Sequence, residues 1–191
     1  MLNEFSCADS IAQSLITWVA AIKLGLSPQD SIASRFDDMK LEALVLALFD
    51  MDVSEAAQMD VLSDSETPFK RCQESFFETL KQVIGQLRLF RLFACTRDGE
   101  HHRSIVPAAY DEWTGEHHPK EMACWRADFR AMRPDQQMMT ATIIWLYRSG
   151  SDSIWLRRVP CTWKASEALH YMHDAGCLAQ WLQLIARYPG W

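Results

Sequence analysis

The sequence predicts an α+β protein, with a helical N-terminal half followed by a mixed half that has one or two antiparallel β-hairpins and a long C-terminal helix. Apolar residues recur at helical spacing through most of residues 11–90 and again through 163–188. Between these stretches, segments rich in Thr, Ile, Trp and Tyr flank small polar turns. The 191 residues suffice for one compact domain over 1–191, although the chain could also divide into a helical part, 1–62, and an α+β part, 67–191.

The first helix is expected to start after Ser10, a good N-cap, and to end at Gly25. Its apolar face is formed by Ile11, Leu15, Trp18 and Ile22. Ser27 and Pro28 then predict the cap and first-turn proline of a short second helix that reaches about Phe36.

Three more helices are predicted before the mixed half. Residues 37–49 form the third, capped by Asp37 or Asp38, and residues 54–62 form a short fourth. Thr67 and Pro68 open the longest periodic segment. Its apolar stripe is formed by Phe69, Cys72, Phe76, Leu80, Val83, Leu87 and Phe90. Residues 87–96 either finish this helix or begin a strand.

One or two β-hairpins are predicted. Asp98-Gly99 is typical of a tight hairpin turn, so residues 96–104, "TRDGEHHRS", are expected to form a surface turn with no catalytic role. Residues 138–148 and 153–160, joined by "SGSD", predict the second hairpin. Between them, Pro119 opens a helix that stops before Pro134.

The chain is expected to end in one amphipathic helix from Trp163 to Tyr188, which could be kinked at Gly176. Bulky aromatic residues at inward positions of the predicted elements are expected to lie in the core. They are Trp125, Phe129, Trp145, Trp155 and Trp181.

Composition and charge narrow the function classes. The formal net charge is −6, and residues 1–96 carry 8 Lys and Arg against 14 Asp and Glu, whereas residues 97–191 carry 11 of each. The acidic half is a poor phosphate-binding surface.

Neither a signal peptide nor an apolar run of membrane-spanning length is evident, which predicts a soluble, cytoplasmic protein without a membrane segment. The six cysteines lack the CxxC pairs of a zinc ribbon and are expected to be buried free thiols.

Residues 20–36 have the spacing of a helix-turn-helix, with Ala21, Gly25 and Ser27 at the small, turn and cap positions. The second helix of this motif would present Gln29, Ser31, Ser34 and Arg35 to DNA. A DNA-binding regulator is therefore a second hypothesis, although Asp30, Asp37 and Asp38 would repel phosphates.

The histidines bear on metal binding and on ribonuclease chemistry. All six occur in pairs, with His170 and His173 at i, i+3 on a helix, but no HExxH pattern is present and no metal site is predicted.

Arg97 and His102 have the Arg-x4-His spacing that resembles the signature of HEPN ribonucleases. In that family the arginine stabilises phosphate charge and the histidine handles a proton, so the resemblance implies a ribonuclease that uses this pair.

The function expected from the sequence is non-enzymatic binding of another protein, without a cofactor, as in an adaptor, a chaperone-like partner or an inhibitor from a bacterium or mobile element. Apart from this Arg-x4-His spacing, no catalytic, cofactor or phosphate-binding signature is present, and specific nucleic-acid binding is not expected. Arginine and tryptophan are typical of interface anchors and concentrate in the second half. The expected interaction surface consists of Arg126, Arg130, Arg133, Arg157, Arg158, Trp163 and Trp191.

Overall fold

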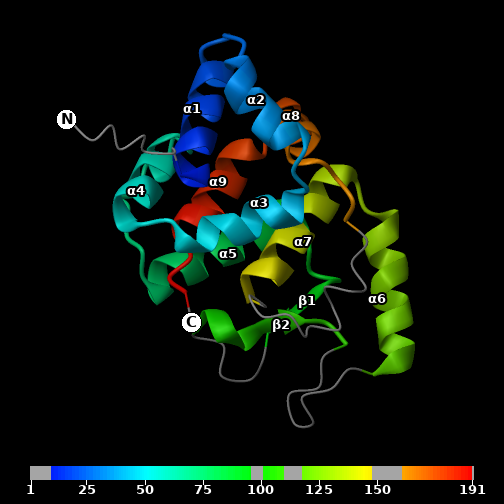
Figure 1. Ribbon diagram of the computed structural model, residues 1–191. Coiled ribbons are helices and arrows are strands. Elements are labelled where there is room, and N and C mark those ends of the chain that lie inside the picture. The colour runs from blue at the N-terminus through cyan, green and yellow to red at the C-terminus, as the bar shows by residue number, and fades with distance from the viewer. Residues whose placement is uncertain (1–9, 96–100, 110–117, 148–160, 191) are drawn as a thin grey trace, which may run out of the picture.

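A computed structural model describes residues 10–95, 101–109, 118–147 and 161–190. Within these ranges the protein has an α+β fold that is mostly helical, with nine α-helices and one small antiparallel sheet. The small sheet lies at one end of the molecule, and most of the helices pack together on one side of it (Figure 1).

The first four helices follow the predicted order: α1 (Ile11–Lys23), α2 (Asp30–Asp37), α3 (Leu41–Ala47) and α4 (Val53–Val61), with a 3₁₀ turn, η1 (Leu48–Asp50), after α3. Ser10 caps α1 as predicted, because its side chain accepts a bond from the Gln13 N–H. The other two predicted caps are wrong. The N-cap of α2 is Gln29 instead of Ser27, and the N-cap of α3 is Lys40 instead of an aspartate, since Asp37 still belongs to α2.

The end of α1 confirms the predicted role of Gly25. This residue has φ +69°, and it is followed by a bond from the Leu26 N–H to the Ala21 carbonyl of 2.9 Å. The Gly25 N–H donates to Ile22 O, so the three residues after the helix complete a Schellman motif. The motif reverses the chain and sets α2 against α1.

The long fifth helix, α5 (Gln73–Gln86), starts later than predicted. The carbonyl of Thr67 and the hydroxyl of Ser65 accept bonds from Arg187, which holds this segment outside the helix. The helix ends at Gln86 and residues 93–95 are a strand, so the structure supports the strand alternative of the open prediction for 87–96.

The predicted hairpin after α5 is confirmed. Strand β1 (Phe93–Cys95) pairs antiparallel with β2 (Ile105–Pro107), in a register that places Ala94 opposite Val106. A 3₁₀ turn, η2 (His102–Ser104), leads into β2 and packs against α5. The expected turn at Asp98-Gly99 lies outside the described residues.

The second predicted hairpin is wrong. Residues 134–147 form a helix, α7 (Pro134–Tyr147), which follows α6 (Pro119–Ala131) after a short break. Every residue from 138 to 146 is buried, so this stretch of the helix is enclosed on all sides and has no polar face. An all-round apolar run has no helical period, and its Thr and Ile content favours a strand when only the sequence is read. The other half of the predicted hairpin, 153–160, lies outside the described residues.

The prediction of a single C-terminal helix is also wrong. Gly176, at φ +72°, separates α8 (Ala165–Asp174) from α9 (Leu178–Ala186). Its N–H donates to His173 O, and the Cys177 N–H donates to Met172 O at 2.9 Å, which is a second Schellman motif. The sequence indicates at most a kink at this position, and the left-handed glycine makes a full break.

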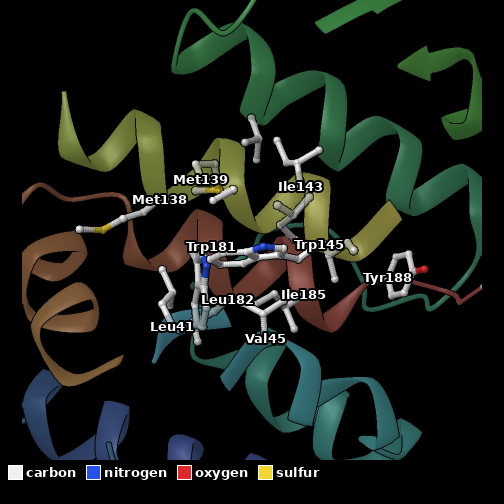
Figure 2. Packing of buried hydrophobic residues seen from close by; sticks show 14 of the residues in the cluster. Leu41, Val45, Met138, Met139, Ile143, Trp145, Trp181, Leu182, Ile185 and Tyr188 are labelled. Carbon is white, nitrogen blue, oxygen red and sulfur yellow. The ribbon is translucent and has the colours of Figure 1, made fainter. Parts of the chain in front are cut away.

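The core gathers side chains from α3, α7 and α9 (Figure 2). Trp145 on α7 and Trp181 on α9 are almost completely buried, and the Trp181 indole N–H donates to the Thr142 hydroxyl at 2.9 Å. Trp125 and Phe129 of α6 are buried as predicted and stack with nearly parallel rings. Trp155 lies outside the described residues. The same buried cluster includes residues of α1 and of α4.

We expect Gly176→Ala to lower the free energy of unfolding by about 1–2 kcal/mol, because an L side chain is strained at its positive φ. Gly85 provides the matched control. It lies inside α5, and a Cβ there meets no atom within 4 Å, so Gly85→Ala should raise the free energy of unfolding by about 0.5–1 kcal/mol. Urea unfolding of both variants measures the two changes. Equal effects of the same sign would contradict the assignment of the break to Gly176.

Candidate protein-binding groove

The residues of the expected interaction surface that the structure describes do not form one surface and lie in two separate parts of the fold. Arg126 and Arg130 lie one turn apart on α6, and the guanidinium of Arg133 binds Asp135 at 2.8 Å, which raises the pKa of the arginine above its ordinary value. Trp163 lies elsewhere, because its carbonyl accepts the Leu41 N–H at the start of α3. Arg157, Arg158 and Trp191 lie outside the described residues.

The predicted helix-turn-helix is present as two helices and a turn, but its chemistry does not suit DNA. Arg35 is the one cation of α2, and its guanidinium donates to the Ser14 hydroxyl of α1. Asp30 and Asp37 stand at the two ends of the helix. A helix that reads DNA needs cations at the phosphates, and α2 offers more carboxylates than cations.

The surface-turn prediction for 96–104 is wrong for His102. This histidine is only 1% exposed, and its ring meets Phe76 of α5 edge to face, with 5.5 Å between ring centroids. Its neighbour His101 is half-buried, with the two imidazoles 4.2 Å apart. The 3₁₀ turn η2 carries His102 inward, against α5. Burial of the histidine lends no support to phosphate chemistry there, and Arg97 lies outside the described residues.

The described histidines of α8 do not converge on a metal. His170 and His173 are exposed on this helix, where the His170 ring packs against Trp18. Within the described ranges, no group of three or more His, Cys, Asp or Glu residues is placed to hold a metal ion.

The clearest candidate site is an apolar groove between α5 and the hairpin, which we call the α5–β1 groove. Its volume is about 460 Å³. The groove is lined by Phe77, Lys81, Ile84, Phe90, Phe93, Ala94, Cys95 and Ile105. Seven of these eight residues are apolar, and Phe90 is 65% exposed. A large exposed aromatic beside an apolar hollow is typical of a docking surface.

No family model, curated protein or solved structure matches the chain. The geometry and charge of the groove therefore carry the functional conclusion. No helix in the described ranges has the length and apolar character needed to cross a membrane.

One cation borders the apolar lining. The Lys81 ammonium lies 4.3 Å from the centroid of the Phe77 ring and 2.6 Å from a Glu78 carboxylate oxygen. Residues 78–95 contain Lys81, Arg88 and Arg91 against the single carboxylate of Glu78, and Arg91 lies 3.8 Å from a carboxylate oxygen of Asp128 on α6. Positive charge therefore slightly exceeds negative charge beside the groove, in a chain whose net charge is −6.

Two of the other hollows in the described residues are less suitable because of the groups that line them. One lies beside α2 and α3 and is lined by both signs of charge, including Arg35, Asp38 and Glu42. The other, of about 780 Å³, contains Arg71, which donates to the carbonyls of Tyr188 and Met51. Burial lowers the pKa of Arg71, and both of these bonds tie the chain together internally.

The prediction of buried thiols holds for one described cysteine. Cys177 is buried, Cys72 and Cys161 are half-buried, and Cys95 and Cys124 are exposed. Burial raises the pKa of both the Cys161 and the Cys177 thiols to about 11. The exposed Cys95 lines the groove, so a thiol reagent gives direct access to this site.

Sequence reasoning missed the groove because it placed Phe90 on the apolar stripe of the long helix. The helix ends at Gln86, and Phe90 follows in the segment that leads to β1. The sequence offers no clear signal here, because "RLF" repeats at 88–90 and 91–93 with a spacing of three residues, which is close to the helical period.

Proposed function

We propose that this protein acts by binding another protein, and that the α5–β1 groove is the binding site. The observation that carries the proposal is the exposed Phe90 beside the apolar groove. Interfaces are centred on aromatic and aliphatic residues that lose their water on binding, and a cationic rim sets the choice of partner. The groove offers the exposed ring of Phe90, a mostly apolar lining and the ammonium of Lys81, which support the proposal.

Phe90 is suited to the role of an anchor. Its side chain already lies at the surface, so its exposure carries a free-energy cost that a partner removes. At about 25 cal/mol per Å² of apolar area, covering one aromatic side chain contributes roughly 2–3 kcal/mol to binding.

Selection from a library of random peptides of about twelve residues displayed on phage tests the proposal. Wild-type protein is expected to enrich a related set of peptides that lose at least about tenfold in affinity for Phe90→Ser. Val61→Ser is the matched control, because Val61 is 75% exposed on α4 and does not line the groove. Both variants should retain the wild-type melting temperature.

Two outcomes contradict the proposal. In the first, the wild type enriches no related set of peptides. In the second, the enriched peptides bind Phe90→Ser as tightly as they bind the wild type, which would place binding at another surface.

A further inference from the structure

The strand that borders the groove indicates which conformation a bound segment of the partner would adopt. All three residues of β1 line it. Alternate residues of a strand point to opposite faces, so a groove that touches three consecutive residues reaches the edge of the strand as well as one face. One edge of β1 is paired with β2, whose Ile105 also lines the groove, so the groove lies over a face shared by the two strands and extends past β1 toward its unpaired edge.

The pairing pattern shows which backbone groups point to that edge. The Ala108 N–H donates to the Leu92 carbonyl at 2.9 Å. In an antiparallel ladder, hydrogen-bonded pairs alternate with non-hydrogen-bonded pairs. Ala94 and Val106, two residues further along each strand, therefore form the next hydrogen-bonded pair.

By the same alternation, Phe93 and Cys95 direct their backbone polar groups away from β2. The Phe93 N–H is taken by the Leu89 carbonyl at 3.3 Å. Three backbone groups then point to the unpaired edge of β1: the Cys95 N–H and the carbonyls of Phe93 and Cys95. Within the part of the chain that the structure describes, this edge therefore offers one donor and two acceptors. Such an edge is a template for a further strand.

One cation close to Phe90 in the chain occupies an unusual backbone position. Arg88 has φ +56° and occupies the left-handed position of a third Schellman motif, in which the Leu89 N–H donates to Ile84 O at 2.9 Å. Glycine adopts this conformation without strain, whereas for arginine it costs about 1–2 kcal/mol. The arginine places a cation two residues before Phe90, where a glycine would give none.

We propose that the occupant of the groove is an extended segment of a partner protein, which adds to β1 as a third strand and carries acidic residues beside its apolar ones. This inference rests on the proposed function and specifies its partner. The backbone row on β1 supplies affinity without sequence preference, while the apolar pockets select alternate side chains of the segment. Lys81, which lines the groove, and Arg88, two residues before Phe90, attract its carboxylates.

Amide hydrogen exchange, measured by NMR on wild-type protein with and without the most enriched phage-selected peptide, tests strand addition. A third strand must accept the Cys95 N–H, so exchange of this amide should slow at least about tenfold on binding. The Ala94 amide is the internal control, because it already bonds to β2 and should change little. Peptide that binds at the groove and leaves the Cys95 amide unprotected overturns strand addition.

Charge reversal tests the acidic character of the segment. Peptides selected on the wild type should be enriched in Asp and Glu, and Lys81→Glu should weaken their binding at least about tenfold. Lys164→Glu, at an exposed lysine that precedes α8 and does not line the groove, should leave binding within about twofold. Peptides that depend on Phe90 but carry no excess of acidic residues would overturn this inference and leave the proposed function standing. Selection of no peptide contradicts both.

Discussion

Replacement of Arg187 by alanine is expected to lower the free energy of unfolding by about 3–5 kcal/mol, because it leaves the Asp60 carboxylate buried without its cation. The two side chains are 6% and 5% exposed and form two parallel bonds, Nε to Oδ1 at 2.8 Å and Nη2 to Oδ2 at 3.2 Å. The same guanidinium holds the hydroxyl of Ser65 and the carbonyl of Thr67. It therefore ties the C-terminal end of α9 to α4 and to the segment that precedes α5. Urea unfolding monitored by circular dichroism measures the change.

The exposed pair between Lys81 and Glu78 is the matched control for this prediction. Its side chains are 46% and 73% exposed, so Glu78→Gln should change the free energy of unfolding by less than about 0.5 kcal/mol. The double variant Asp60→Ala with Arg187→Ala should lose less than the sum of the two single variants, since no buried charge is left alone. Additive losses would show that the two charges do not interact.

Replacement of Trp181 by alanine should lower the free energy of unfolding by about 3–5 kcal/mol through the cavity it leaves. Trp181 is fully buried on α9, and Figure 2 shows it among side chains of α3 and α7. The substitution also removes the donor to Thr142. Trp163→Ala, at a half-buried tryptophan outside the helices, should cost clearly less. Comparable losses in the two variants would contradict the central position of α9.

Local signals predicted the elements that depend on local chemistry. Ser10 caps the start of α1 and Gly25 ends it, as expected, since a cap and a left-handed glycine act on their immediate neighbours. The first hairpin followed from the turn signal at Asp98-Gly99 and its apolar flanks.

Tertiary burial decided the elements that the sequence misassigned. Residues 138–146 are enclosed on every side, so no polar face marked α7 as a helix. His102 is buried because η2, a turn of three residues for which no helical period exists, places its ring against Phe76 of α5. The candidate groove was equally invisible, because it needs α5 and β1 to meet, and only the fold brings Phe77 beside Phe93.

The most direct test of the binding proposal is an NMR titration of the wild-type protein with the most enriched selected peptide. We expect saturable shift changes that are largest at Phe77, Ile84, Phe90 and the three residues of β1, with signals of α2 and α8 unmoved. Saturable binding whose largest shifts fall outside the α5–β1 groove, with the Phe90 and β1 signals unchanged, would contradict the proposal.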